Sequence, residues 1–215
     1  NNCTIKILQG GSQDLYDSAK SSQVGDLYLP GSSSYRDKFI KEGLLLDGKF
    51  VGYNKLSLVV KKGNPKNVKA SLEELTNEEL NVVLGNEQSG SAGLASKKVL
   101  TKFGLYERAM SNAVSLVPDS RNLINAIKNG NADLILNWHA TTFWDNNREF
   151  VEAIVLDDES SQKSKLVFNL LSSSKNKELS KKFMDYASSV EGREVFKKYG
   201  FLDEEDMKNF DKVVF

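Results

Sequence analysis

The chain has 215 residues, of which 40% are apolar, and its 29 Lys and Arg residues balance its 29 Asp and Glu residues. This size and composition are typical of a folded globular protein with one large domain or two small lobes, and they argue against a disordered chain. With no basic excess, the composition does not indicate binding to nucleic acid or to an anionic membrane surface. No apolar run approaches the roughly 18 residues that span a bilayer. The first residues show no signal-peptide pattern, which predicts a chain that is cytosolic or already mature.

The chain contains one cysteine, Cys3, and one histidine, His139. A single cysteine excludes an intramolecular disulfide and a CxxC metal site, and a single histidine excludes a multi-histidine metal centre. We therefore expect neither a metal nor a cofactor. Cys3 is either a passive terminal residue or a lipid-anchored or reactive thiol, and the absence of a lipobox before it favours the passive role.

Short apolar runs alternate with helical patterns along the chain. Val, Ile and Leu dominate most of these runs continuously, as expected for strands that are covered on both faces. The alternation predicts an α/β fold with mostly parallel sheets. The predicted strands are Thr4–Leu8, Asp26–Leu29, Lys55–Lys61, Asn81–Leu84, Asp133–Asn137, Val151–Leu156 and Lys165–Leu171.

Helix start and stop signals lie between these runs. The segment Ser71–Glu74 fits a capping box. Tyr35–Glu42 follows three serines and ends at Gly43, which is a favourable C-terminal residue for a helix. Asp119 precedes apolar residues that share one helical face. Two helices are expected in the C-terminal tail, separated at Gly192.

Three predicted strands end in small polar clusters that open a helix. These clusters are Gly10–Ser12, Pro30–Ser34 and Gly85–Gly93. In an open α/β sheet, ligands bind at the carboxyl ends of the strands. Helix N-termini at that edge present unpaired N–H groups and about half a positive charge, which suits a carboxylate or an oxyanion. Taken singly, each cluster also fits an ordinary turn followed by a helix cap, so composition alone leaves both interpretations open.

Signals for an enzyme are weaker. The sequence has no G-x-S-x-G elbow, no Walker loop and no G-x-G-x-x-G motif. His139 either lines a cleft or has a capping or surface role, and Asp157 and Asp158 fit a solvated turn better than a divalent-cation site. This sparse set of titratable candidates disfavours an enzyme on this fold, such as a transferase.

Each of three aromatic or basic residues near the predicted strand Asp133–Asn137 has two possible roles, one in ligand binding and one in the structure. Trp138, at the strand end, and Trp144 either close over a ligand or pack in the core. Arg121, at a helix start, either meets an anion or pairs with Asp119, and we favour the ion pair.

Four segments in this order resemble the periplasmic molybdate-binding proteins of ABC importers and, more broadly, the type II periplasmic binding protein fold. The resemblance covers most of the chain, and the first and last segments are moderately specific for that family and its oxyanion-binding relatives. The segments are YNKLSLVVKKGNP (Tyr53–Pro65), NVVLGNEQSGSAGLASKKVLTKFGL (Asn81–Leu105), VPDSRNLINAIKNGNADLILNW (Val117–Trp138) and KELSKKFMDYASSVEGREVFKKYGF (Lys177–Phe201).

The resemblance implies two α/β lobes that close over an anion and are joined by two crossing strands. The crossing strands would be Lys55–Lys61 and Lys165–Leu171. One lobe would hold residues 1–57 and 164–215, and the other residues 58–163. Members of this family hold a dehydrated oxyanion with neutral donors, because fixed dipoles can replace the hydration of the ion.

The resemblance also implies where the ligand is bound. Ser12 matches the serine of the family's second binding loop, and Ala92 matches the alanine of its proline-alanine-glycine loop. The family's tyrosine is replaced by Trp138, whose indole donates one hydrogen bond. The expected ligand-binding residues are Gly11, Ser12, Ser32, Ser33, Ser91, Ala92, Gly93, Ser120, Arg121 and Trp138.

The implied function is that of a periplasmic solute-binding protein without catalytic activity. It would be a monomer, either free after signal-peptide removal or lipid-anchored outside the inner membrane, and would pass a small anion to the permease of an ABC importer by hinge closure. In the family an additional strand precedes the segment that matches Thr4–Leu8, and its loop supplies another binding serine. The alternative function is a sensory or LysR-type effector domain that binds a small carboxylate or a peptide-like ligand.

Overall fold

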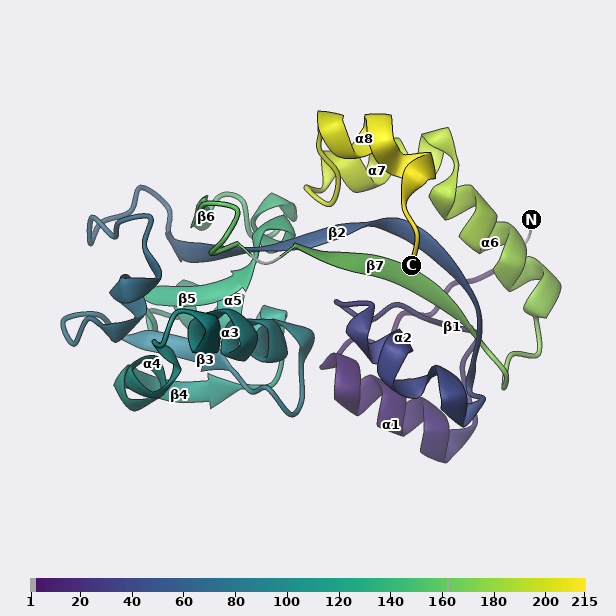
Figure 1. The fold of residues 1–215 in the computed structure, drawn as a ribbon, viewed down its shortest axis with the longest axis horizontal. Coiled ribbons are helices and arrows are strands. Elements are labelled where there is room, and N and C mark those ends of the chain that lie inside the picture. The colour runs from purple at the N-terminus through teal and green to yellow at the C-terminus, as the bar shows by residue number, and fades with distance from the viewer. Residues whose placement is uncertain (1–2, 162) are drawn as a thin grey trace.

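One strand, β2 (Leu45–Lys61), runs through both lobes of the protein (Figure 1). The computed structural model describes residues 3–161 and 163–215. The first part of β2 pairs with β7 (Lys163–Leu171), and its last part pairs with β5 (Leu134–Trp138) and β6 (Val151–Ile154). Because β2 changes partners along its length, it carries the chain from one lobe into the other. The two-lobed arrangement that the sequence predicted is therefore present.

The remaining elements surround these strands. The other strands are β1 (Leu27–Tyr28), β3 (Val82–Gly85) and β4 (Ala113–Val117). The α-helices are α1 (Ser12–Ser22), α2 (Ser34–Phe39), α3 (Ser91–Lys102), α4 (Tyr106–Asn112), α5 (Ser120–Lys128), α6 (Lys177–Ser188), α7 (Val190–Lys198) and α8 (Glu204–Asn209). Within the described residues, 3-10 helices span Ile40–Glu42, Leu72–Thr76, His139–Phe143 and Phe210–Lys212.

The sheet has the strand order β1-β7-β2-β5-β3-β4, with β6 also paired to β2. The expectation of mostly parallel pairing is wrong. Among the described residues, β2 is antiparallel to β5, β6 and β7, and β1 is antiparallel to β7. Only β3 makes parallel pairs, with β4 and β5. Parallel strands need a crossover connection. Within the described residues, α3 and α4 connect β3 to β4, and α5 connects β4 to β5.

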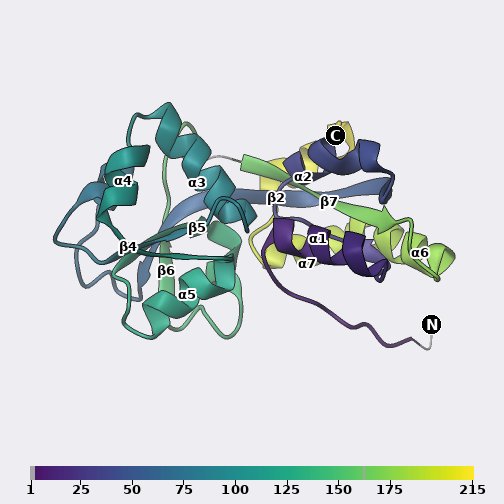
Figure 2. The same cartoon turned by 90° about the horizontal axis from the view of Figure 1, so that it is seen from below.

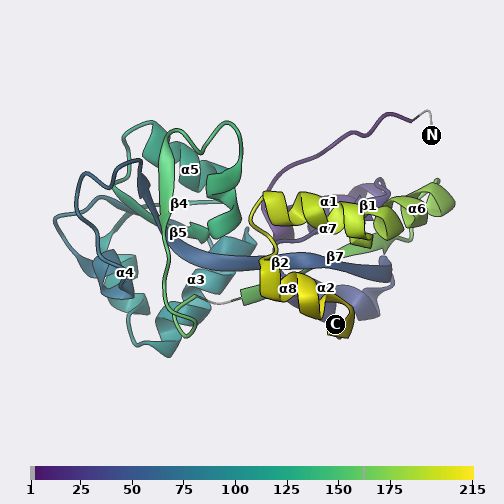
Figure 3. The same cartoon turned by 90° about the horizontal axis from the view of Figure 1, so that it is seen from above.

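Helices cover both faces of the sheet in the lobe that contains both chain ends. Figure 1 shows α1 and α2 below β7 and the helices α6, α7 and α8 above it. The view from above places α7 and α8 in front of β2 (Figure 3). The view from below shows the N-terminal end of α1 beside the other lobe (Figure 2).

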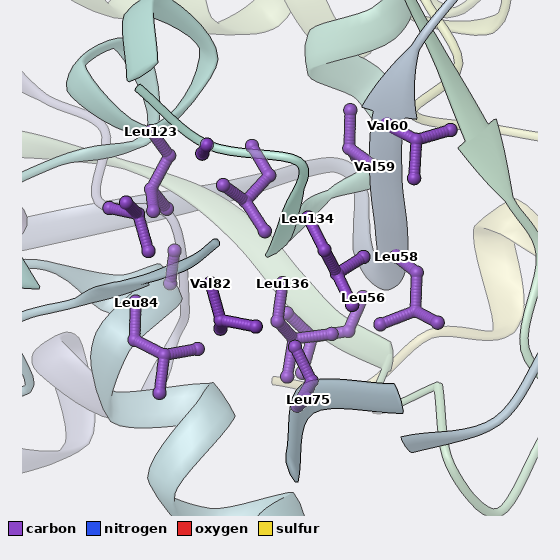
Figure 4. Packing of buried hydrophobic residues seen from close by; sticks show 14 of the residues in the cluster. Leu56, Leu58, Val59, Val60, Leu75, Val82, Leu84, Leu123, Leu134 and Leu136 are labelled. Atoms are coloured by element: carbon purple, nitrogen blue, oxygen red, sulfur yellow. The ribbon is translucent and has the colours of Figure 1, made fainter. Parts of the chain in front are cut away.

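A large apolar core holds the other lobe together. Its strands contribute side chains that point toward one another from β2, β3 and β5, and α3 and α5 cover them (Figure 4). All members of this core cluster lie between Leu56 and Leu156. Separate, smaller clusters hold the first lobe, one built around Tyr16, Phe39 and Leu171. Each lobe therefore has its own core, and Trp138 of the large cluster also reaches the other lobe.

Two strand predictions need correction. Thr4–Leu8 forms no strand, and Ile5, Ile7 and Leu8 are 64%, 74% and 81% exposed. An apolar run forms a strand only beside a hydrogen-bonding neighbour, and the described chain places none along this segment. The strand predicted at Lys55–Lys61 begins earlier, at Leu45, where register shifts next to Gly48 and Gly52 hide the strand pattern.

Helix boundaries follow most of the sequence signals. Asp119 caps α5 as predicted, accepting hydrogen bonds from the N–H groups of Arg121 and Asn122 at 2.9 Å. The prediction that Gly192 separates two helices is wrong, because the break falls at Ser189 and Gly192 lies inside α7. A β-carbon on Gly192 would lie 2.3 Å from the carbonyl oxygen of Tyr186, so this glycine lets α7 start against the end of α6.

The capping box predicted at Ser71–Glu74 forms only in part. Ser71 Oγ accepts a hydrogen bond from the N–H of Glu73, but Glu74 Oε1 accepts from Lys69 N–H rather than from Ser71. The strand β4 was not predicted. It lies at the edge of the sheet, where Val114 and Leu116 are exposed.

Candidate ligand-binding site

The N-terminus of α1 carries the first predicted binding loop. Gly11 is its N-cap, so no side chain caps the first N–H groups of the helix, and one of them, Gln13 N–H, donates to the Ser89 carbonyl of the other lobe. Ser12 is buried, and its Oγ accepts a hydrogen bond from Gly31 N–H at 3.1 Å. Tyr28 also fixes the backbone of Ser12, because its hydroxyl donates a hydrogen bond to the Ser12 carbonyl at 2.7 Å. The hydroxyl proton of Ser12 has no acceptor among the described residues, and it therefore remains available to a ligand.

The second predicted loop leads from β1 into α2. Gly31 is held by Asn54, whose side-chain amide donates to the Gly31 carbonyl at 2.9 Å. Ser33 donates its backbone N–H to the Lys165 carbonyl at 2.8 Å. Ser32 Oγ lies 2.9 Å from Ser34 Oγ and accepts from Ser34 N–H. Ser32 and Ser33 therefore make their hydrogen bonds within the first lobe, and Gly31 is the residue of this loop that contacts the second lobe.

The third predicted loop begins α3. Its N-cap is Gly90, which also lacks a side-chain cap, and Ser91, Ala92 and Gly93 are buried. A β-carbon on Gly93 would lie 2.5 Å from the Asn86 carbonyl oxygen, so this glycine lets α3 start tight against the end of β3. Gly93 is therefore required for packing, while Ser91 faces the first lobe.

These loops meet at one place, which we call the interlobe junction and define by Gly11, Ser12, Gly31, Ser91 and Trp138. Trp138 Nε1 donates to Ser91 Oγ at 3.1 Å, and a β-carbon on Gly31 would lie 2.1 Å from that Oγ. In addition, Gln13 N–H donates to the Ser89 carbonyl at 3.0 Å. The N-terminal ends of α1 and α3 thus face the same point from the two lobes, as the view from below also shows (Figure 2).

The junction is built from neutral groups. Its polar atoms are two serine hydroxyls, one indole N–H and the backbone N–H groups at two helix starts. The N-terminal partial charges of the two helices both favour an anion there. One carboxylate lies close by: Asp14, in the first turn of α1, places Oδ2 2.9 Å from the position of a β-carbon on Gly11. Asp14 therefore opposes part of the positive potential of α1.

Six predicted site residues lie outside the junction as defined: Ser32, Ser33, Ala92 and Gly93 in the loops described above, and Ser120 and Arg121 on α5. Arg121 pairs with Asp119 at 3.0 Å and reaches Gln9 of the other lobe, so the ion pair that we favoured is confirmed. Ser120 contributes its carbonyl oxygen, which accepts from Asn137 at 3.0 Å. Asn137 in turn accepts from Trp138 N–H at 2.8 Å. Ser120 and Arg121 thus support the junction from α5 rather than line it.

Two titratable groups near the junction have shifted pKa values. Burial raises the pKa of Asp119, but hydrogen bonds from Asn122 and Arg121 outweigh it and hold the net pKa below its usual value. Burial, and then the positive charge of Lys55, lower the pKa of His139. Both effects favour the neutral imidazole, and the ring packs edge-on against Phe143 with 5.1 Å between ring centroids. This packing gives His139 a structural contact.

Sequence reasoning missed three contributors to the junction. Gly31 and Ser89 lie in the predicted clusters Pro30–Ser34 and Gly85–Gly93 but were not among the expected ligand-binding residues. Asn54 is a buried polar side chain within β2, and it ties the crossing strand to Gly31. Asn54 lies among other polar residues of β2, such as Lys49, Lys55 and Ser57, so no local pattern in the sequence distinguishes it. Among the described residues, no three His, Cys, Asp or Glu side chains gather as a metal site requires.

Two cavities lie away from the junction. One, of about 460 Å³, lies at the far end of β2 between Lys61, Lys66, Lys128 and Phe150. The other, of about 270 Å³, lies between α3, α4 and the edge strand, where Glu87 accepts hydrogen bonds from Lys97 and Tyr106. Neither cavity includes a residue of the junction.

Residues 1–202 match the family model of the bacterial extracellular solute-binding proteins. The chain belongs to this family. No helix within the described residues is long and apolar enough to cross a membrane. A search of curated proteins by sequence gave no significant match to this solute-binding protein.

Solved structures confirm the type II periplasmic binding protein fold. The solute-binding protein is similar to the periplasmic molybdate-binding protein of Azotobacter vinelandii, with a TM-score of 0.77 and 18% identity over 94% of this chain and 88% of that chain. It is also similar to the substrate-binding domain of a putative molybdenum ABC transporter from Clostridium difficile, with a TM-score of 0.64 and 22% identity over 93% and 86%.

A third similar structure has a different ligand. It is a periplasmic binding protein of Actinobacillus pleuropneumoniae with fructose-6-phosphate bound, with a TM-score of 0.74 and 14% identity over 91% of this chain and 74% of that chain. At such identities the likeness shows the fold alone. The ligand must therefore be argued from the residues of the junction.

Proposed function

We propose that this solute-binding protein captures a small anion between its lobes, with a molybdate-like oxyanion favoured, and delivers it to the membrane permease of an ABC importer. It acts as a periplasmic monomer, free or lipid-anchored outside the inner membrane. The separate cores support lobe boundaries near residues 57 and 163, because the large cluster contains only residues from Leu56 to Leu156.

One observation carries the proposal for the ligand. Ser12 and Ser91 belong to different lobes, and each uses its Oγ to accept one hydrogen bond at the junction, from Gly31 and from Trp138. Each hydroxyl keeps a proton to donate, and each serine lies in the first turn of a helix that has no side-chain cap. An oxyanion accepts several hydrogen bonds at once, so it can bind both hydroxyls and hold the lobes together.

The donors favour a fully ionised oxyanion. The backbone N–H groups donate and cannot accept, so they leave the proton of a protonated oxygen without an acceptor, and the indole N–H holds Ser91 Oγ in place. No basic side chain contacts the junction residues among the interactions of the described chain, and fixed dipoles supply the compensation instead. Molybdate, tungstate and sulfate match this donor set.

Isothermal titration calorimetry and thermal-shift measurements test the proposal. The panel contains molybdate, tungstate, sulfate, phosphate, fructose 6-phosphate, thiamin and amino acids. We expect one of the tetrahedral oxyanions to bind and to raise the melting temperature, and Ser12→Ala to weaken that binding. Ser18→Ala is the matched control, because Ser18 lies on the same helix and is exposed. Binding of thiamin or an amino acid with no response to the oxyanions would contradict the proposal.

A further inference from the structure

The two lobes touch through glycines at the interlobe junction. Gly11 and Gly31 both belong to the first lobe, and both lie against backbone or side-chain atoms of the second. A β-carbon on Gly11 would lie 2.3 Å from the carbonyl oxygen of Ser89. A β-carbon on Gly31 would lie 2.1 Å from Ser91 Oγ, 3.0 Å from Ser91 Cβ and 3.2 Å from Trp138 Nε1. Any side chain at either position would have to displace the facing lobe.

Neither glycine is needed by its own loop. Gly11 has φ −61° and ψ 145°, an extended conformation that any residue adopts. Gly31 is absent from the glycines of positive φ in the described chain. Most turn glycines are explained by a left-handed backbone, and that explanation fails at both positions. The requirement for glycine comes instead from the approach of the other lobe.

The approach at Gly11 is held by a hydrogen bond between backbone atoms. The Ser89 carbonyl that faces Gly11 also accepts the N–H of Gln13 at 3.0 Å. A carbonyl in the main chain cannot turn away as a side-chain rotamer can, so a methyl group on Gly11 and this hydrogen bond exclude each other. At Gly31 a rotation of Ser91 would relieve only one of the three contacts, and it would cost the hydrogen bond from Trp138.

We propose that Gly11 and Gly31 are positioning residues that allow the lobes to close to backbone contact, and that this depth of closure restricts the cargo to a compact anion. The closure itself does not depend on the nature of the cargo, whereas the size limit rests on the proposed function. A tetrahedral oxyanion is small enough for the Gln13–Ser89 hydrogen bond to form around it, while a phosphate ester with a sugar attached holds the lobes further apart.

Closure can be measured without any ligand through Trp138. Its side chain is 3% exposed and lies between Ser91 and Gly31, so opening of the lobes brings water to the indole. The second tryptophan, Trp144, is removed by Trp144→Phe to give a background with a single tryptophan, which is excited selectively over the tyrosines. In that background, we expect Gly11→Ala to shift the emission to longer wavelength and to raise acrylamide quenching several-fold.

Gly10→Ala is the matched control. Gly10 is the preceding residue of the same loop, and the nearest atom to its β-carbon is in the flexible Leu15 side chain at 3.4 Å, an ordinary contact. This variant should keep the emission and quenching of the background protein. Equal quenching in Gly11→Ala and the background, or an equal rise in Gly10→Ala, would overturn the proposal. Gly31→Ala repeats the test at the second contact if Gly11→Ala does not fold.

Titration calorimetry with molybdate and fructose 6-phosphate then tests the size limit. Because Gly11→Ala loses the Gln13–Ser89 hydrogen bond, its dissociation constant for molybdate should rise about fivefold or more over that of the wild-type protein. The change for fructose 6-phosphate should be smaller. Equal weakening of both ligands would overturn the size limit. If the wild-type protein binds no anion, the proposed function and the size limit fail together, while the fluorescence result still decides whether the glycines set closure.

Discussion

The substitution Ser91→Ala tests the chemistry of the interlobe junction most directly. Among the described residues, Ser91 Oγ is the one acceptor of the buried Trp138 indole N–H, at 3.1 Å, and the substitution removes it. A buried donor left without a partner costs about 1–3 kcal/mol, so we expect the free energy of unfolding to fall by about that amount. The loss is largest when the lobes are closed, because only then is the indole shielded from water.

The same substitution withdraws a hydroxyl donor from the bound anion. A hydrogen bond to a charged acceptor contributes about 1.5–3 kcal/mol. At about 1.4 kcal/mol for each tenfold change, the dissociation constant for the oxyanion should rise about 10- to 150-fold. Isothermal titration calorimetry with the best oxyanion of the panel measures this change, and urea unfolding measures the stability.

Ser96→Ala provides the control for this experiment. Ser96 lies on the same helix and is also buried, but its Oγ has no hydrogen-bond partner in the described structure. Removing an unpaired buried hydroxyl should leave the free energy of unfolding unchanged or higher. Anion binding should also be unchanged. An unaltered dissociation constant in Ser91→Ala, or an equal loss of binding in Ser96→Ala, would refute the role assigned to the Ser91 hydroxyl.

Three further measurements follow from the geometry. Asp14→Asn should strengthen anion binding at low salt by about 0.3–1 kcal/mol, because it removes a negative charge from the α1 N-terminus; a gain that persists at high salt would exclude this electrostatic origin. Asp119→Ala should lower the stability by about 1–2 kcal/mol at pH 7 through loss of the α5 cap. The pKa of Asp119 is lowered in the fold, so its contribution is complete above its usual value of 3.8 and is lost as the pH falls through the folded pKa. Urea unfolding of wild type and Asp119→Ala at neutral and acid pH should show the difference shrink, and a constant difference would count against the cap as its source. Leu136→Ala should cost about 2–5 kcal/mol by thermal or urea unfolding, because Leu136 is fully buried in the large core; a cost near zero would show that the core collapses around the gap.

The sequence predicted β3, β5, β6 and the part of β2 that lies in the second lobe, but it missed the edge strand β4. The predicted strands of this lobe are continuous apolar runs, and Asp119 and the glycines of Gly85–Gly93 mark helix starts that the structure confirms. These signals are local, since a cap or a buried run acts on its own neighbours. The strand predicted at Thr4–Leu8 failed because a strand also needs a partner, and no local pattern reports whether one exists.

The candidate site was predicted in part. Gly11, Ser12, Ser91 and Trp138 come together at the junction, while Arg121 does not join them. Ser32, Ser33 and Ser120 have the residue types expected of donors, but their recorded contacts lie within their own lobe. Serine before a helix serves as a cap, a backbone contact or a ligand donor, and only the facing surface decides among these.

The family resemblance implied the two lobes, whereas the sequence by itself determined the alternation of strands and helices, the helix starts at the ends of strands and the exclusion of a multi-histidine metal centre or an intramolecular disulfide. Those properties follow from apolar periodicity, capping residues and composition, which are all local or additive. Only the tertiary structure decided that Gly31 lies against Ser91 and Trp138, residues from 60 to 107 positions away in sequence. Such contacts depend on how β2 changes partners and carries one lobe onto the other, and a single chain position does not encode that approach.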